Sequence, residues 1–148
     1  MIENEVASII KAVLDCSDIA NVYYNNIPES FAVPAVFFPS PEIEIQPDTL
    51  NGYASEYTMY VNFFHSTTED AYELAVPVLH GITSLRKLVP LLNTYGEGTG
   101  DFVRIKNMNL KKADECAYQL QIDWISRRPY TRSEAELVRE FYINGGRI

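Results

Sequence analysis

The sequence predicts an α+β fold, in which one mostly antiparallel sheet carries a long helix and a further helix forms near each terminus. Two periods in the apolar residues support this fold class. Segments 57–63 and 116–124 alternate apolar and polar residues, as half-buried strands do. Segments 2–14, 71–85 and 137–142 repeat apolar residues every three or four positions, as helices do. The chain shows no internal repeat and no strict βαβ alternation, which favours an antiparallel sheet with helices on a face.

The N-terminal third predicts one helix followed by three extended segments. The apolar stripe of this helix comprises Ile2, Val6, Ile9, Ile10, Val13 and Leu14. Residues 20–27 read as a strand that stops before a proline, and residues 33–38 and 42–46 are extended segments interrupted or flanked by Pro34, Pro39, Pro41 and Pro47. Because proline cannot donate to a ladder, we expect the last two segments to be edge strands or bent strands.

The middle of the chain predicts the clearest strand and the longest helix. The strand covers residues 57–63, and residues 66–70 then supply cap hydroxyls and first-turn carboxylates for the helix. Pro77 lies inside the helical pattern, where it removes one hydrogen bond and crowds the preceding turn. We therefore expect a kink or a break near Pro77. The helical pattern fades over residues 88–92.

The last third predicts a loop, a hairpin and a short helix. Residues 93–101 are rich in glycine and have no apolar period, which is typical of a flexible loop. The apolar face switches within segment 102–110, so a β-bulge is expected near Asn107. This strand and the strand over 116–124 are expected to form a hairpin. A capping box begins at Ser133, and the short helix that follows is closed by the glycine pair 145–146.

Composition limits the class of protein. A chain of 148 residues fits a single domain, residues 1–148, with a core of its own. The formal net charge of −8 disfavours a nucleic-acid reader. Cys16 and Cys116 belong to no metal or redox motif, and we expect free, buried thiols. The first residues are acidic, unlike a signal peptide, and no apolar run is long enough to span a membrane, so we expect the protein to stay in the cytoplasm.

No motif predicts catalysis, a cofactor or a metal. His65 and His80 stand in no nucleophile or triad context. The glycine-rich run 96–100 follows a helix and precedes a strand, the reverse of the order that a phosphate loop needs. Glu42 and Glu44 share one face of a strand, where two carboxylates could form a calcium site or an acid–base pair. The preferred interpretation is that they form a solvated strand face. The sequence therefore indicates that the protein is not an enzyme.

Charged and aromatic residues suggest surfaces for assembly. Tyrosines are numerous, and several lie beside residues assigned to the inward face, which is typical of an interface, although tyrosine is also a good strand former. Basic residues concentrate late in the chain, where they either meet an acidic neighbour or act as ordinary solubilising charge. The candidate interface residues are Glu97, Asp101, Arg104, Lys106, Arg127, Arg128 and Tyr130.

The order of elements and several local strings resemble the tail terminator, or tail completion, proteins of tailed bacteriophages and phage-like particles. The strings are residues 23–28, 34–38, 67–72 and 118–124. The resemblance implies a small α+β structural subunit that forms a ring, usually a hexamer, on the head-proximal end of the tail tube. Its implied partners are further copies of the chain, the tail tube protein, the neck or head connector protein and, in a contractile tail, the sheath protein.

In such a ring, the protein assembles in the bacterial cytoplasm and resides in the virion tail. DNA passes only as cargo, and acidic residues such as Glu97 and Asp101 are hypothesised to line the lumen and keep DNA from sticking. Two alternatives stay open: another head–tail connector of the neck, and a dimeric ligand-binding or regulatory α+β module. An enzyme with dispersed catalytic residues is the least favoured class.

Overall fold

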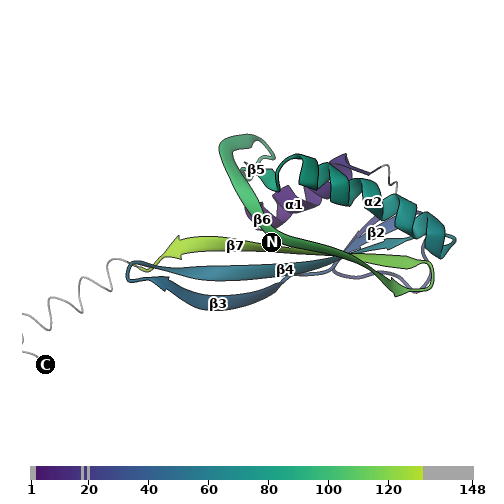
Figure 1. The fold of residues 1–148 in the computed structure, drawn as a ribbon, viewed down its shortest axis with the longest axis horizontal. Coiled ribbons are helices and arrows are strands. Elements are labelled where there is room, and N and C mark those ends of the chain that lie inside the picture. The colour runs from purple at the N-terminus through teal and green to yellow at the C-terminus, as the bar shows by residue number, and fades with distance from the viewer. Residues whose placement is uncertain (1–2, 18, 20, 132–148) are drawn as a thin grey trace, which may run out of the picture.

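The computed structural model describes residues 3–17, 19 and 21–131 and confirms the α+β class (Figure 1). Within these residues a mixed sheet is covered on one face by two helices. The elements are α1 (Asn4–Asp15), β1 (Asn21–Tyr24), β2 (Ala35–Phe38), β3 (Glu42–Thr49), β4 (Gly52–Phe64), α2 (Thr68–Ser84), β5 (Leu88–Leu92), β6 (Gly98–Asp114) and β7 (Ala117–Pro129).

The sheet runs in the order β1-β2-β4-β7-β6-β5, with β3 also paired to β4. Only the β1–β2 pair is parallel; the other strand pairs are antiparallel. β2 and β3 share one edge of β4, because β2 pairs with residues 62–64 and β3 with residues 52–58. The middle of the sheet is the ladder between β4 and β7, which is unbroken from Gly52 opposite Pro129 to Phe64 opposite Ala117.

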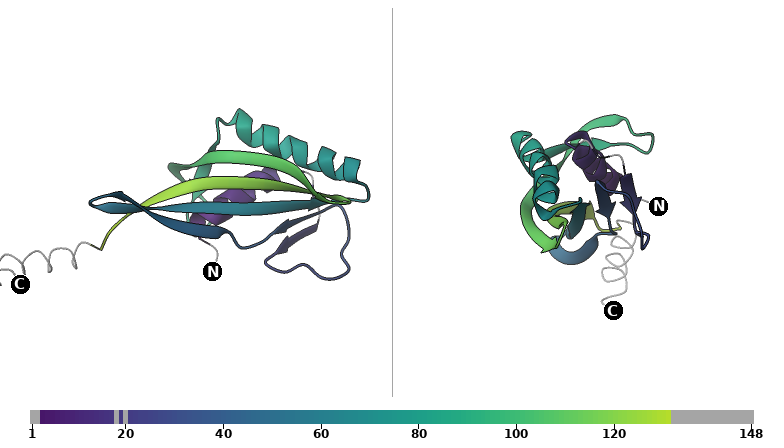
Figure 2. Two further views of the ribbon diagram at one scale, coloured as in Figure 1. Left: turned by 60° about the horizontal axis from the view of Figure 1, so that its bottom comes forward. Right: turned by 90° about the vertical axis from the view of Figure 1, so that its right-hand side faces the viewer.

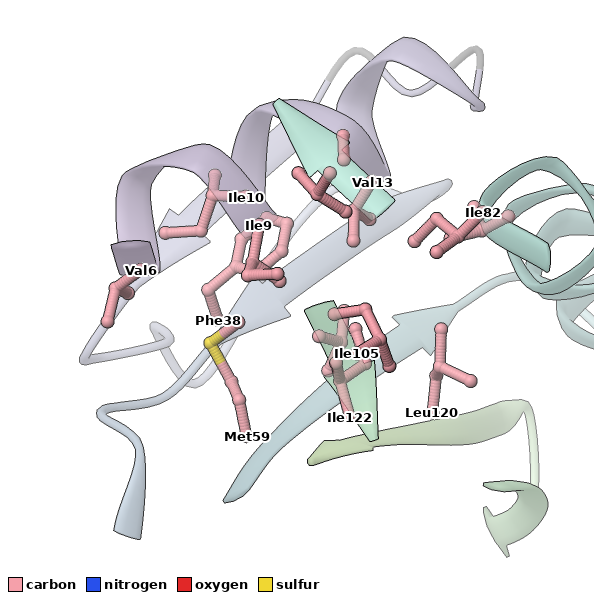
Figure 3. Close-up of a cluster of buried hydrophobic side chains, with 14 of the residues drawn as sticks. Val6, Ile9, Ile10, Val13, Phe38, Met59, Ile82, Ile105, Leu120 and Ile122 are labelled. Atoms are coloured by element: carbon pink, nitrogen blue, oxygen red, sulfur yellow. The ribbon is translucent and has the colours of Figure 1, made fainter. Parts of the chain in front are cut away.

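The hydrophobic core lies between the helices and one end of the sheet. Figure 3 shows side chains from α1, α2 and several strands converging there. Fully buried examples are Ile9, Met59, Ile82, Leu120 and Ile122. β5 lies beside α1, where the amide of Leu92 donates to the hydroxyl of Ser8 over 2.9 Å. The two views of Figure 2 show both helices on the same face of the curved sheet.

Several sequence predictions are confirmed. The register of β6 against β7 shifts between Ile105 and Asn107, which is the expected bulge, and these two strands form the expected hairpin. The side chain of Thr67 caps α2 by accepting a hydrogen bond from the amide of Asp70 over 3.1 Å. β3, with Pro47 in it, lies at an edge of the sheet as expected. The predicted C-terminal helix lies outside the described residues.

Other predictions are wrong. The helix α2 runs from Thr68 to Ser84 through Pro77, so the expected break is absent; both Pro77 and Glu73, whose carbonyl loses its partner, are exposed residues, which leaves that carbonyl open to water. β2 is flanked by β1 and β4, so it is no edge strand; its prolines lie just outside it. The segment 88–92 is a strand, and the loop predicted for 93–101 is reduced because β6 already begins at Gly98.

The two cysteines are free, as expected, but half-buried rather than buried. Cys116 lies in the tight turn between β6 and β7 with a φ of 62°, and Cys16 is the C-cap of α1. Burial and the neighbouring charge of Asp15 raise the pKa of the Cys16 thiol. The place of Cys16 also brings it against α2, where Gly81 leaves room for its sulfur.

We predict that Gly81→Ala destabilises the protein although alanine is the better helix former. A Cβ at position 81 would lie 2.5 Å from Sγ of Cys16 and 3.1 Å from its Cβ, so the Cys16 side chain must turn away or the end of α1 must move from α2. The expected loss is about 1–3 kcal/mol of unfolding free energy, measured by chemical denaturation. The control is Gly98→Ala, whose added Cβ has no heavy atom within 4 Å. Equal or higher stability of the Gly81→Ala variant would contradict this packing.

Candidate assembly interface

The sheet continues beyond its helices as a three-stranded arm, visible at the left of Figure 1. We define the arm as β3, residues 52–56 of β4 and residues 125–129 of β7. Side chains alternate between the two faces of a strand, and Ile43 of β3 pairs with Tyr57 of β4. Ile43 therefore shares the face that the helices cover elsewhere, the inner face. All eight residues of β3 are exposed.

The inner face of the arm carries an exposed row of apolar side chains, the apolar strip, made of Ile43, Ile45, Pro47, Tyr53 and Tyr130. Ile43 is 48% exposed, Ile45 60% and Tyr130 45%. Leu50 in the turn at the tip of the arm is 98% exposed. The rings of Tyr53 and Tyr130 lie 5.5 Å apart and join the end of β7 to the strip. Apolar side chains grouped in this way on a protruding element are typical of a contact surface.

An open groove of about 720 Å³ lies between the strip and the main body. Ile43, Ile45 and Tyr53 line it from the arm, and the first residues of α1 line it from the body. Leu91 of β5 and Thr94 of the turn between β5 and β6 form a further part of its wall. The strip is thus reachable from the inner face of the sheet.

A polar network lies where the core ends and the arm begins. The carboxylate of Glu5 accepts hydrogen bonds from the indole of Trp124 over 3.0 Å and from the hydroxyl of Ser126 over 2.7 Å. The carboxylate of Glu3 accepts one from the hydroxyl of Tyr57 over 2.5 Å. These bonds tie the start of α1 to the two central strands and satisfy polar groups at the edge of the core.

Arg128 completes this network. Its guanidinium donates to Glu3 over 3.2 Å and to the hydroxyl of Tyr57 over 3.1 Å. Burial raises the pKa of Tyr57 to about 12, and the hydrogen bond to Glu3 and its charge add to this, while the charge of Arg128 opposes it. Burial by itself would lower the pKa of Arg128, but the charges of Tyr57, Glu3 and Glu5 raise it. The arm is therefore held to the start of α1 by the bonds of Ser126 to Glu5 and of Arg128 to Glu3, and the neighbouring bond from Tyr57 to Glu3 needs a neutral Tyr57.

The outer face of the arm is mostly acidic. Glu42 and Glu44 lie on this face, opposite Thr58 and Glu56 of β4. Glu56 accepts hydrogen bonds from Lys106 over 3.0 Å and from Gln46 over 3.2 Å. Arg127 pairs with Asp48 over 3.2 Å. Exposed ion pairs of this kind contribute little to stability. The outer face is a solvated surface, which agrees with the interpretation preferred for Glu42 and Glu44 from the sequence.

The structure brings together some of the predicted interface residues. Arg127, Arg128 and Tyr130 meet at the end of β7 on the arm, although Arg127 faces outward and Arg128 inward. Lys106 joins the outer face of the arm through Glu56. Arg104 is exposed on β6 opposite Leu88.

Glu97 and Asp101 lie in a different region, the exposed turn between β5 and β6 and the start of β6. Tyr95 and Phe102 of the same hairpin are 87% and 58% exposed. Tyr130 is the one strip residue among the predicted interface residues, whereas Tyr95, Phe102 and the rest of the strip were not predicted. The alternation of Ile43 and Ile45 with acidic residues was the available signal for the strip, but it does not distinguish a buried face from a bare one.

The described residues show no arrangement for nucleophilic catalysis around either histidine. Nδ1 of His65 accepts from the amide of Ser66, and the same nitrogen faces the hydroxyl of Ser66 at 3.0 Å and Asp70 at 3.8 Å. A catalytic triad uses the two opposite ring nitrogens instead. His80 is exposed on α2. Within the same part of the chain, no group of histidine, cysteine and carboxylate residues is placed to hold a metal, and no helix is long and apolar enough to cross a membrane.

Comparison with known proteins identifies two relatives in Bacillus subtilis (strain 168). The phage-like element PBSX protein XkdJ is 30% identical over 125 residues, which cover 84% of this chain and 86% of the relative. The uncharacterized protein YqbJ matches with the same identity and the same coverage. No protein-family model matches. Among solved structures, a chain from the virion of a native gene transfer agent particle is 14% identical, with a TM-score of 0.44 over 82% of this chain and 84% of that one.

We predict that Tyr57→Phe lowers stability by about 1 kcal/mol near neutral pH, because it removes the hydrogen bond to Glu3. The raised pKa means that unfolded Tyr57 ionises first, near pH 10, whereas the folded form resists ionisation up to about 12. The advantage of the wild type over the variant is therefore complete below pH 10 and is lost as the pH rises towards 12. Denaturant titrations of both proteins at several pH values measure this difference.

The matched control for this prediction is Tyr95→Phe, which removes a hydroxyl from a ring that is 87% exposed. This variant should match the wild type in stability near neutral pH. A stability difference between wild type and Tyr57→Phe that stays constant across the alkaline range would contradict the buried, neutral Tyr57 described above.

Proposed function

Since the chain belongs to the family of the phage-like element PBSX protein XkdJ, we propose that it is a structural subunit of a phage or phage-like particle, and specifically the subunit of the ring that ends the tail tube. In this role the protein caps the head-proximal end of the tube, stops its polymerisation and provides the joint to the neck and head. The virion tail is its final location, after assembly in the bacterial cytoplasm.

The observation that carries the proposal is the arm with its apolar strip. A subunit that works alone has no use for Ile45 at 60% exposure and Leu50 at 98% on a protruding hairpin. A subunit that works in an assembly buries such residues against a neighbour.

A closed ring suits this surface better than a two-fold dimer. The arm is a single protrusion on one side of the domain, so a neighbouring copy can meet it with a different surface of its own. Contact between two different patches on successive copies is heterologous and generates a ring when the rotation closes. The resemblance to tail terminators implies six copies.

Deleting the gene in the bacterial strain that encodes it tests the proposed function. After induction of particle production, tail lengths are measured by negative-stain electron microscopy. We expect overlong or unjoined tails of scattered length, because nothing then stops tube growth. Complementation with the intact gene should restore a uniform length.

Two other outcomes would reject the terminator. Normal-length tails that lack heads would assign the protein to the neck. Intact, infectious particles would remove the assembly role altogether and leave a ligand-binding or regulatory module.

Substitution of Glu97 and Asp101 tests the proposal that acidic residues line the lumen of the ring. Both residues are exposed and project from the hairpin of β5 and β6. We propose that this hairpin faces the channel and repels the phosphate backbone of passing DNA. The double variant Glu97→Gln/Asp101→Asn should assemble normal tails but deliver DNA less efficiently, measured as transducing or infectious titre per particle. The matched control is Glu42→Gln/Glu44→Gln on the outer face of the arm, and equal titres for the two variants would reject the lumen position.

A further inference from the structure

We propose that residues 133–144 of one copy form an amphipathic helix that packs on the apolar strip of a second copy. This inference rests on the proposed function only in that it requires the chain to associate with itself. It assigns an occupant to the strip and a purpose to the C-terminal segment.

The strip needs an occupant because the helices of the domain do not reach it. The part of the sheet that the helices cover ends at the first turn of α1, where Glu3 and Glu5 form the polar network. Beyond that point, the inner face carries Ile43, Ile45 and Tyr53 with open space in front of them. On β3 and at Tyr53 this exposed face is thus apolar, and Arg128 of β7 borders it.

The C-terminal segment has the composition of a helix that covers such a face. A capping box starts at Ser133, where a Glu follows three residues later. Charged residues at positions 136, 139 and 140 lie on the other side of the expected helix. Its apolar stripe comprises Leu137, Val138, Phe141 and Tyr142.

The lengths match. A helix over residues 133–144 is about 18 Å long at a rise of 1.5 Å per residue. β3 has eight residues, and at 3.3 Å per residue it spans roughly 26 Å. One such helix therefore covers most of the strip and leaves the tip of the arm free.

The direction in which the chain leaves the arm favours a second copy as the acceptor. The ladder continues past the last strand pair, since the amide of Tyr130 donates to the carbonyl of Asn51 over 2.9 Å. At Tyr130 the chain therefore still runs outward, away from its own domain. Only Thr131 and Arg132 remain before the expected cap, and this short link has no glycine, proline, asparagine or aspartate, the residues that most favour chain reversal. We therefore expect the segment to continue beyond its own arm, towards a neighbour.

Exchange of C-terminal helices would also explain the strip's position at the end of β7. The strip and the exit point of the chain are adjacent through the contact of Tyr53 with Tyr130. Each copy then donates a helix and accepts one next to the same hairpin. If the donor and the acceptor are always different neighbours, the exchange closes a ring.

Disulfide trapping tests the exchange in the full-length chain. In a background with Cys16→Ala and Cys116→Ala, one preparation carries Ile45→Cys and a second, longer by a tag, carries Val138→Cys. After mixing and mild oxidation, we expect a covalent heterodimer on a non-reducing gel, because the two side chains are brought within disulfide reach only across copies. The matched control pairs Val138→Cys with Glu44→Cys, whose side chain lies on the opposite face of the same strand, and it should give no such product.

The outcomes are decisive in both directions. In one further experiment, a single chain carries both cysteines and is oxidised at high dilution. If this chain closes an intrachain disulfide and the mixture gives no heterodimer, the helix folds back on its own arm and the proposal is overturned. Equal yields for Ile45→Cys and Glu44→Cys would also overturn it. Thermal unfolding of each variant confirms that it folds, since positions 44 and 45 lie outside the core.

A second variant tests the exchange without added cysteines. The wild-type chain should form an oligomer in native mass spectrometry. Leu137→Asp/Phe141→Asp places charges on the expected stripe and should abolish this oligomer, whereas Glu136→Gln/Glu140→Gln should retain it. An oligomer that survives the aspartate substitutions would contradict the exchange. Deletion of the gene addresses the tail role separately: trapped heterodimers with normal tails would reject only the terminator, and scattered tails without heterodimers would reject only the exchange.

Discussion

The ladder between β4 and β7 is the constraint on which the rest of the structure depends. These two strands pair over thirteen residues without a register shift, so one inner face runs unbroken from the core to the tip of the arm. Along β7 that face reads Leu120, Ile122, Trp124, Ser126 and Arg128. The change from apolar to polar marks the point where α1 ends its cover, and the strip begins beyond it.

The polar network makes this transition stable. A sheet face that leaves a core abruptly would expose apolar edges or bury unsatisfied polar atoms. Here Trp124 is fully buried and stacks on Tyr57 with ring centroids 5.1 Å apart, while its indole N–H and the Tyr57 hydroxyl each find a carboxylate of α1. The start of α1 therefore fixes the arm relative to the domain, and in the described residues no buried side-chain polar atom lacks a partner.

The sequence predicts the parts of the fold that have a regular period and misses those that do not. Alternation identifies β4 and β7, and the change of face at Asn107 identifies the bulge. β5 is missed because Leu88–Leu92 is a short apolar run directly after a helix, where neither period can be recognised. Of the interface residues, the sequence identifies the charged ones near Arg127 but does not identify Ile43 and Ile45 as exposed. These two isoleucines alternate with polar residues as core residues do, and they are exposed only because α1 does not extend over them.

The two faces and the edge of the arm differ in a way that favours one mode of association. An exposed edge strand invites pairing with any other strand, but β3 carries Pro47 and, on its outer face, Glu42 and Glu44, which oppose such pairing. The inner face has no such protection and offers an apolar surface that a helix fits. The arm thus resists open-ended sheet growth while it leaves one apolar face free for the proposed helix. This combination is what a subunit needs if its assembly must stop at a closed ring.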